Sequence, residues 1–523
     1  MIHMAGRKKV MIKTRPWLDR LHYGLTMALL GVLISTCAPS HMVPPANQFH
    51  SSFSHQVLQA AFEGLLDYHI QESDPRQLAL WSLDGLETLD IGLQIDTEDD
   101  RLVMRQSDGT VSYLALPIEN ETDAWVTATV EAIVLARENS KALSELGGEK
   151  ITDAMLSSTL QHFDRFSRYK NAASANNSRA ARSGFTGIGV SIEKSPNGVR
   201  IIAVYDDGPA AEVGLKIGDI LRSVDGVDVR QASPQEVATL VRGRKGTAVR
   251  LDLLRDSQLM TFDIIRQRVI LQSVKVTRED GFTLVRLSSF NNGTTEALRK
   301  ALRNDRRNGK TLGLILDLRG NRGGLLNQAV DVSDVFLDHG KILVTDGRNF
   351  RADQQFIAED DSLAYGVPMV VIVNQKSASA AEVLAAALQD NNRALLIGSR
   401  TYGKGTVQTV IRLPDGGEMT VTWARMFAPS GYALSTFGVY PDLCTIDLAD
   451  PGGNDRSTIR QAQERAASLL VQRRKSATLS DNDRQTLLQS CAPKEPKNPE
   501  IDADLQTAKA ILGTPNLALL PAN

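Results

Sequence analysis

Histidine is scarce in this chain of 523 residues, which holds eight histidines, and only His339 lies beyond His162. A catalytic triad of serine, histidine and aspartate in the C-terminal half would therefore have to use His339. That residue stands in Leu337-Asp-His-Gly340, which is typical of a helix end or a turn, and we interpret it as a polar loop residue. The chain also lacks a large net charge, because its basic and acidic residues nearly balance and the formal net charge is −2. So small a charge gives no reason to propose a nucleic acid as partner.

The N-terminus has a basic region followed by a largely apolar run at Leu21–Thr36. This run is shorter than the roughly 20 residues that a membrane-spanning helix needs, and it suits an export signal. Ile34-Ser-Thr-Cys37 approximates a lipoprotein cleavage box, although Thr36 is larger than the residue usual before the cysteine. Lipidation at Cys37, ordinary signal cleavage and an uncleaved signal that anchors the chain in a membrane are the alternatives. All three predict a periplasmic or other extracytoplasmic location.

Cysteine is scarce as well, and the chain has three cysteines. If Cys37 belongs to the leader, Cys444 and Cys491 remain as an even pair in an oxidising compartment. We predict a disulfide between them that ties the C-terminal tail to the domain before it. Two buried free thiols are the alternative.

A serine and a lysine stand in a pattern that favours nucleophilic chemistry. The apolar run Met369–Val373 predicts a buried strand, and the alanine-rich run Ala380–Gln389 predicts a helix. Ser379 therefore lies at a helix N-terminus, where free backbone N–H groups and the helix dipole can hold a developing negative charge. Lys404 follows in a glycine-flanked loop, where a lysine kept out of water loses its charge more easily and can act as a general base.

Each of the two residues alone has a plainer interpretation, with Ser379 as a helix N-cap and Lys404 as a surface lysine in a turn. A serine hydroxyl is a weak nucleophile near neutral pH unless a base accepts its proton. The order of strand, serine, helix, strand and lysine loop therefore favours a Ser/Lys dyad.

The segments Ser377-Ala-Ser-Ala-Ala-Glu382 and Tyr402-Gly-Lys-Gly-Thr-Val-Gln408 resemble the C-terminal processing peptidases, also called tail-specific proteases. The resemblance implies that Ser379 is the nucleophile, Lys404 the general base and Gln408 the residue that orients the lysine. Ser379, rather than Ser377, falls at the nucleophile position of that family. No metal, nucleotide or other cofactor is implied.

The glycine-rich segment Asp317-Leu-Arg-Gly-Asn-Arg-Gly-Gly324 ends the second strand of a predicted βαβ unit, formed by Thr283–Phe290, Thr294–Asn308 and Leu312–Asp317. By itself this segment is a turn that needs positive φ angles. A phosphate-binding loop is excluded, because no Lys-Ser or Lys-Thr follows the glycines. In the resembling family the turn supplies one oxyanion-hole N–H. Here that N–H would come from Gly323 or Gly324 and would be paired with the N–H of Ala380, while Arg322 stands where the family often has proline.

The segment Gly184–Arg268 resembles a PDZ domain over nearly its whole length. The segment Gly187-Ile188-Gly189-Val190 would expose backbone N–H groups to the C-terminal carboxylate of a peptide, and the following strand would pair with the peptide backbone. The candidate pocket residues, which could equally be core residues, are Val190, Ile192, Val237 and Leu240. We interpret Arg242 as a solvated side chain, with coupling of this domain to the active site as the alternative.

The rest of the chain is predicted to be mainly helical. Helices are expected at Phe53–Leu66, Pro75–Glu87, Asp123–Leu146, Thr152–Phe163, Thr458–Arg474 and Asp502–Leu512, with a β-hairpin turning at Asp108-Gly109. The expected domains are a leader at 1–37, a linker at 38–52, a mainly helical N-terminal domain at 53–183, a PDZ domain at 184–268, a Ser/Lys peptidase core at 269–447 and a helical tail at 448–523.

The resemblance covers roughly Gly184–Asp447 and implies an exported serine endopeptidase whose α/β catalytic core is of the crotonase-like type. Its PDZ domain would bind protein substrates by their C-termini. Members of the family are often oligomeric and some depend on helical-repeat adaptor lipoproteins, so a homo-oligomer and such an adaptor are candidate assemblies. The alternatives are a catalytically silent PDZ scaffold or sensor, a protease that is inactive until an adaptor opens it, and a Ser/Lys amidase for small amides. The PDZ domain disfavours the amidase, because a small substrate has no use for a peptide-docking strand.

Overall fold

The computed structural model describes residues 48–205, 208–360, 362–364, 366–435, 437–445, 448, 480–492 and 502–513 of the chain. The expected leader, most of the expected linker and the helix expected at Thr458–Arg474 lie outside the described residues. The chain divides into two compact units, and the first comprises residues up to 175 together with 344–355 and 406–426. The second comprises the remaining residues from 176 onward.

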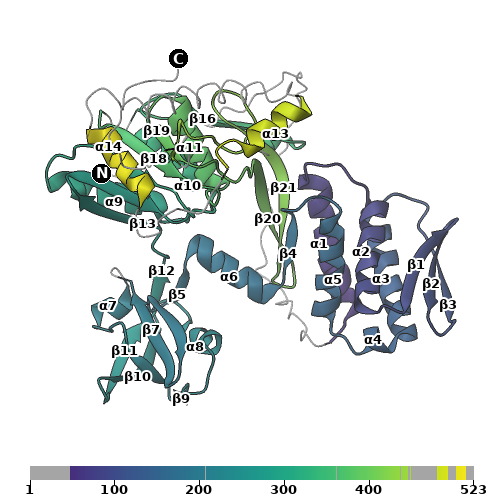
Figure 1. Ribbon diagram of the computed structural model, residues 1–523. Coiled ribbons are helices and arrows are strands. Elements are labelled where there is room, and N and C mark those ends of the chain that lie inside the picture. The colour runs from purple at the N-terminus through teal and green to yellow at the C-terminus, as the bar shows by residue number, and fades with distance from the viewer. Residues whose placement is uncertain are drawn as a thin grey trace, which may run out of the picture. The chain divides into compact units, whose positions relative to one another are not determined.

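Helices make up most of the N-terminal part of the first unit (Figure 1). They are α1 (Ser51–Tyr68), α2 (Pro75–Leu89), α3 (Thr122–Asn139), α4 (Lys141–Ser144) and α5 (Gly148–Gln161). The helix α2 starts at Pro75 because proline fits the first helical position and the Asp74 carboxylate accepts the Gln77 N–H at 2.9 Å. A shared core fixes these helices, with Phe62, Leu78 and Met155 among its fully buried side chains.

A single helix was expected at Asp123–Leu146, and the structure corrects this to two helices, α3 and α4. The break falls at Ser140, whose Oγ accepts the Leu143 N–H at 3.1 Å and donates to Asp90 at 2.6 Å. A serine that bonds the backbone in this way caps a new helix instead of continuing the old one.

The expected hairpin at Asp108-Gly109 is confirmed, with Gly109 at a φ of +91° and strands β2 (Arg101–Gln106) and β3 (Val111–Ala115) on either side. A further strand, β1 (Leu93–Glu98), extends this hairpin to a three-stranded antiparallel sheet. A second sheet has the order β17-β16-β21-β20, and β4 also pairs with β21. Its strands are β4 (Arg168–Lys170), β16 (Lys341–Asp346), β17 (Gln354–Ile357), β20 (Thr406–Arg412) and β21 (Glu418–Phe427), with the short 3-10 helix η1 (Phe350–Ala352) between β16 and β17.

Within the second unit, residues 184–269 form a small β-rich domain. Its sheet has the order β11-β10-β8-β7-β6, and β9 pairs with β8. The strands and helices are β6 (Val190–Ser195), β7 (Gly198–Val204), α7 (Pro209–Glu212), β8 (Ile220–Val224), β9 (Val227–Asp228), α8 (Pro234–Val241), β10 (Ala248–Arg255) and β11 (Gln258–Ile265). The pair β5 (Phe185–Gly187) and β12 (Gln267–Val269) joins the two ends of this segment, and the helix α6 (Ala172–Ser183), which was not expected, precedes it.

The other part of the second unit is built on a six-stranded sheet of order β13-β14-β15-β18-β19-β22. Its strands are β13 (Val274–Glu279), β14 (Phe282–Leu287), β15 (Leu314–Asp317), β18 (Met369–Val373), β19 (Leu395–Gly398) and β22 (Leu443–Cys444). All neighbours from β14 to β22 are parallel, which confirms the expected βαβ pattern. The strands β15, β18 and β19 are buried along their whole length, because helices cover parallel sheets on both faces.

The helices of this α/β part are α9 (Thr294–Arg307), α10 (Leu326–Phe336), α11 (Ala380–Asp390), α13 (Asp481–Gln489) and α14 (Ala503–Gly513). The expected C-terminal helix is thus confirmed as α14, which packs on β18 and β19 (Figure 1), whereas α13 was not expected. The predicted disulfide is also confirmed, since Cys444 and Cys491 are bonded with a Cα–Cα distance of 5.8 Å. In parallel sheets, functional loops gather at the carboxyl ends of the strands, and the candidate site lies on the loops that follow β15 and β18.

Candidate active site

Ser379 lies in the sharp turn between β18 and α11, as the sequence predicts. Its backbone has φ +57° and ψ −116°, a conformation that residues with a side chain rarely adopt. A nucleophilic serine on a strained strand-to-helix turn of this kind is held at the helix N-terminus with its Oγ presented outward. The residue is half-buried, which suits a group that must meet a substrate.

The neighbouring Ser377 is fully buried and has a structural role. Its Oγ donates to the Leu318 carbonyl at 2.8 Å and accepts the Asn374 N–H at 3.0 Å. These bonds join the loop after β18 to the loop after β15. Of the two serines in the motif, Ser377 is therefore occupied in holding the turn, which supports Ser379 as the candidate nucleophile.

Glu382, one helical turn beyond Ser379, is a fully buried carboxylate that joins the two predicted catalytic segments. Its Oε2 accepts the backbone N–H of Ser379 at 2.7 Å and that of Lys404 at 2.9 Å. Its Oε1 accepts the Thr401 hydroxyl at 2.5 Å and the Gly403 N–H at 2.7 Å. Burial raises the pKa of this carboxyl, and the four hydrogen bonds oppose that rise.

Glu382 was not predicted from the sequence as a functional residue. The signal was present, because a serine followed three residues later by a glutamate at a helix start is the capping-box pattern. What the pattern could not show is that the same carboxylate also accepts an N–H from the lysine loop.

The loop that carries Lys404 depends on glycines on both sides of the lysine. Gly403 has a φ of +87°, and a Cβ on Gly405 would collide with the backbone at Ser435. The N–H of Tyr402 donates to the Ser377 carbonyl at 3.0 Å. The structure therefore brings the Lys404 loop against the Ser379 turn through two separate contacts, one at Glu382 and one at Ser377.

The glycine-rich loop after β15 lies against the same turn. A Cβ on Gly323 would lie 2.9 Å from the Ser379 Cβ and 3.0 Å from the Ala380 nitrogen, so only glycine fits there at its φ of +95°. The Asn321 carbonyl accepts the Ala378 N–H at 2.9 Å, which fixes the loop to the turn. Gly323, Ser379 and Ala380 are thus neighbours, as the predicted oxyanion hole requires. The Gly323 N–H itself donates to Asn321 Oδ1 at 2.9 Å.

Gln408 lies on β20, in the first unit. Its Nε2 donates to the Thr406 hydroxyl at 2.8 Å and to the Thr422 hydroxyl at 3.4 Å, on strand β21. The predicted orientation of Lys404 by Gln408 stays a prediction.

The hydrogen bonds of Gln408 continue into a buried network around Asp164. Asp164 Oδ1 accepts the Thr422 hydroxyl at 3.2 Å, and Oδ2 accepts the Ser167 hydroxyl at 2.7 Å and lies 3.1 Å from His69 Nε2. Burial alone would raise the pKa of the Asp164 carboxyl, but the hydrogen bonds from His69, Ser167 and the backbone outweigh it and hold that pKa well below its usual range. In a catalytic triad the serine donates to the histidine, whereas Ser167 donates to the aspartate. We therefore interpret these residues as a structural hydrogen-bond network and not as a second triad.

The segment predicted to bind a peptide carboxylate lies between β5 and β6. The carbonyls of Ile188 and Gly189 accept the N–H groups of Ala210 and Tyr205 at 2.8 and 2.9 Å. Gly189 has a φ of +83° and Ile188 is 1% exposed, so the isoleucine side chain anchors the loop in the core. Gly187 ends β5 and Val190 begins β6, so the segment runs directly into the strand that was expected to pair with a peptide.

The other candidate residues of this domain differ in how deeply their side chains are buried. Val237 is fully buried and belongs to the core, Val190 and Ile192 are partly buried against it, and Leu240 is exposed. The interpretation of Arg242 as a solvated side chain is wrong. The residue is half-buried, and its guanidinium lies 5.0 Å from the centre of the Phe185 ring, because a guanidinium stacks favourably on an aromatic face.

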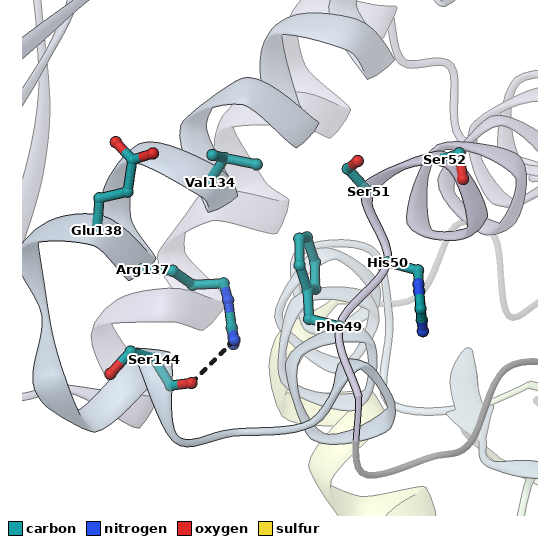
Figure 2. A pocket seen from close by; sticks show the side chains of 8 residues that line it. All are labelled: Phe49, His50, Ser51, Ser52, Val134, Arg137, Glu138 and Ser144. Carbon is teal, nitrogen blue, oxygen red and sulfur yellow. Dashed lines mark hydrogen bonds between the residues drawn. The ribbon is translucent and has the colours of Figure 1, made fainter.

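A hollow of about 480 Å³ lies elsewhere, among the helices of the first unit (Figure 2). Arg137 borders it, but its guanidinium already donates to the carbonyls of Leu143, Ser144 and Leu146 at 2.6 to 2.9 Å. Desolvation lowers the pKa of this arginine. None of the predicted catalytic or peptide-binding residues lines this hollow.

Comparison with known proteins identifies the class of the molecule. The model of peptidase family S41 matches residues 281–445, and a PDZ domain model matches residues 200–255. The chain is therefore a serine peptidase that carries a PDZ domain. Among the described residues, none of the helices has the length and apolar character needed to cross a membrane.

Relatives narrow this class to a family. A carboxy-terminal-processing protease of Bartonella bacilliformis is 34% identical over 335 residues, which are 63% of this chain and 77% of that protein. A carboxyl-terminal-processing protease of Synechocystis is 35% identical, over 49% of this chain and 62% of that protein. The chain therefore belongs to peptidase family S41, the family of these carboxy-terminal-processing proteases. A solved structure of a photosystem II D1 C-terminal processing protease is 26% identical and covers 70% of this chain and 92% of that one, with a TM-score of 0.35.

Proposed function

We propose that this protease cleaves peptide bonds with a dyad in which Ser379 is the nucleophile and Lys404 the general base. The observation that carries the proposal is the shared carboxylate oxygen of Glu382, which accepts the backbone N–H of both residues. A buried acceptor that fixes both backbones reduces the number of arrangements that the two side chains can adopt. Such preorganisation is what a serine needs in order to be activated by a base that lies far away in the sequence.

The reaction follows from these roles. The neutral Lys404 Nζ takes the proton of the Ser379 hydroxyl while Oγ bonds to the scissile carbonyl carbon and the carbonyl π electrons move to its oxygen. The N–H groups of Ala380 and of Gly323 or Gly324 stabilise that oxyanion. The tetrahedral intermediate then expels the amine, which takes the proton from the Lys404 ammonium. Water, activated by the same lysine, releases the acyl group from Ser379.

The oxyanion donors differ in their present partners. The Gly323 N–H bonds to Asn321 Oδ1, so its use would require the asparagine side chain to turn away. Gly324 has a φ of +148°, and a Cβ there would collide with the Phe290 backbone, so only glycine fits at this position. Gly323 is the glycine that lies against Ser379 and Ala380, which supports its N–H as the candidate donor once the asparagine releases it.

The PDZ domain supplies the preference for chain ends in this proposal. The segment from Gly187 to Val190 would receive the terminal carboxylate of a protein substrate, and β6 would add the substrate as a further strand. In the proposed assembly the catalytic part is crotonase-like, Gln408 orients Lys404, and the protein acts as a homo-oligomer with a helical-repeat adaptor lipoprotein as candidate partner. We also propose that the chain is exported, with its N-terminus as the candidate membrane anchor. The disulfide between Cys444 and Cys491 supports export, since such bonds persist in oxidising compartments.

A pair of synthetic substrates tests this proposal without altering the protein. The two peptides share one apolar C-terminal sequence, and one ends in a free carboxylate while the other ends in an amide. We expect the parent chain to cleave the free acid at least about tenfold faster at low substrate concentration, since an amide loses the charge-assisted bonds to the loop. Ser379→Ala should cleave neither peptide. Equal cleavage of both peptides would contradict recognition of chain ends, and cleavage by Ser379→Ala would contradict the dyad.

A further inference from the structure

Arg319, in the glycine-rich loop after β15, is held by three carboxylates, one of which lies in the first turn of α14 and another on the residue just before that helix. Its guanidinium donates to both oxygens of Asp502 at 2.7 and 2.8 Å and to Asp504 Oδ2 at 3.2 Å. It also donates to both oxygens of Asp317 at 3.0 Å. The Arg319 side chain is 20% exposed and that of Asp317 is buried, whereas the Asp502 side chain is 43% exposed, so water screens the Asp502 pair more than the Asp317 pair.

The helix that brings these two aspartates is firmly seated. The side chains of Ala508, Ile511 and Leu512 on α14 are buried against strands of the central sheet. A second polar contact lies farther along the helix, where Lys509 donates to Glu279 at 2.6 Å and to Asp280 at 2.8 Å. The start of α14 is held as well, because Asp504 Oδ1 accepts the Thr445 hydroxyl at 2.6 Å.

The loop beyond Arg319 leads directly to the candidate oxyanion hole. The Gly320 N–H donates to Asn374 Oδ1 at 3.1 Å, and the Asn321 carbonyl accepts the Ala378 N–H at 2.9 Å. Asn321 Oδ1 accepts the Gly323 N–H at 2.9 Å, and Gly323 lies against Ser379 and Ala380. Gly323 follows Arg319 by four positions, so a shift of the arginine would move the glycine pair relative to Ser379.

We infer that Asp502 and Asp504, at the N-terminal end of α14, are positioning residues for catalysis, which act through Arg319 to hold the oxyanion loop in register with Ser379. The inference rests on the proposed function of Ser379 and of the Gly323–Gly324 turn. The arginine suits this role because its planar fork bonds two carboxylates in a bidentate manner, which fixes direction as well as distance. Burial alone would lower the pKa of Arg319, but the hydrogen bonds and charges of Asp502 and Asp317 outweigh it and raise that pKa above its ordinary value, so the guanidinium stays charged.

The sharpest test is Asp502→Asn. Asp502 Oδ1 accepts the Leu505 N–H at 3.1 Å and so caps α14, and asparagine caps a helix as well as aspartate does. The substitution keeps the helix and removes the charge and one acceptor from Arg319. We expect kcat for an unfolded protein substrate to fall about tenfold with KM unchanged, because a misplaced oxyanion donor weakens the transition state and not substrate binding.

Two further variants complete the experiment. Asp502→Asn with Asp504→Asn should lower kcat further, toward about a hundredfold. Lys509→Met removes the other charged contact of the same helix and should leave kcat unchanged, and the thermal melting of every variant is recorded. A structural role alone would lower melting temperatures without separating kcat from KM. Parent-like kcat in both aspartate variants, or an equal loss in Lys509→Met, would overturn the inference.

The same assay separates this inference from the proposed function. An active parent with an inactive Ser379→Ala shows that the dyad holds, so a normal kcat in Asp502→Asn then contradicts only the role of α14. Activity that persists in Ser379→Ala would contradict the proposed function first, and with it the basis of this inference.

Discussion

The backbone nitrogen of Lys404 lies 2.9 Å from Oε2 of Glu382. That oxygen also accepts the N–H of Ser379, so one buried carboxylate connects the two halves of the proposed dyad. The contacts of Glu382 with these two residues are to their backbone N–H groups. Its role is to fix the Ser379 turn and the Lys404 loop with respect to each other.

Glu382→Gln should lower kcat at least about tenfold while leaving the chain folded. The new amide keeps the size of the side chain but provides one acceptor oxygen, so the donors at Ser379 and Lys404 or those at Thr401 and Gly403 lose their partner. The measurement is steady-state cleavage of an unfolded protein, beside a melting curve for each variant.

A matched control lies on α8, where Ser233 and Glu236 form the same capping box at the protein surface. Glu236→Gln should leave kcat within about twofold of the parent, since a surface cap contributes to helix stability and not to the site. Equal kcat in Glu382→Gln and the parent would show that the carboxylate does not position the dyad.

Asp164→Asn should lower the free energy of unfolding by about 2 kcal/mol at pH 7, because several donors then lose a charged acceptor. The Asp164 pKa is depressed in the folded chain, so its contribution is complete above the unfolded value of about 3.9 and is lost as the pH falls through the lower folded value. The difference between parent and variant should therefore shrink below about pH 4, as measured by urea unfolding at a series of pH values.

The surface pair of Asp84 and His162, also 3.1 Å apart, provides the control for that experiment. Both side chains are substantially exposed, so Asp84→Asn should change the free energy of unfolding by less than about 1 kcal/mol at any pH. A difference for Asp164→Asn that stays constant from pH 7 to pH 3 would contradict the depressed pKa.

The disulfide between Cys444 and Cys491 closes a sequence separation of 47 residues, and the Cys491 carbonyl accepts the Arg400 N–H at 3.2 Å. Replacing both cysteines by serine should lower the stability of the α/β part by about 2–4 kcal/mol, since the unfolded chain is then less constrained. A reductant should lower the melting temperature of the parent and leave that of the double variant unchanged. Equal responses of the two proteins to the reductant would contradict a stabilising disulfide.

Local sequence patterns were sufficient to predict most secondary-structure elements around the candidate site. The buried strand β18, the helix α11, the βαβ unit and the disulfide all agree with expectation, because continuous apolar runs, helix formers and cysteine parity are local signals. The helix α6 escaped prediction because Ala175 is its only buried residue, so its sequence has no apolar stripe.

The contacts that matter most at the candidate site are those between distant segments, and the sequence did not predict them. In the sequence Glu382 is only one residue of a motif. Its bond to the Lys404 loop forms because β19, which precedes that loop, lies beside β18 in the sheet and so brings the loop next to the Ser379 turn. Asp502 and Arg319 are far apart in sequence, so their pairing appears only once α14 packs on the sheet. Arg242 was misjudged for the same reason, since it follows helix α8 and its partner Phe185 lies far back in the sequence, on strand β5.

Degradation of casein by the mature chain, beside Ser379→Ala, Lys404→Ala and Lys376→Ala, tests the central claim most directly. Lys376 is an exposed lysine in the same turn as Ser379 and serves as the matched control. The dyad predicts cleavage by the parent and by Lys376→Ala, and a loss of at least about a thousandfold in the other two variants. Cleavage by Ser379→Ala or Lys404→Ala at the rate of the parent would contradict it.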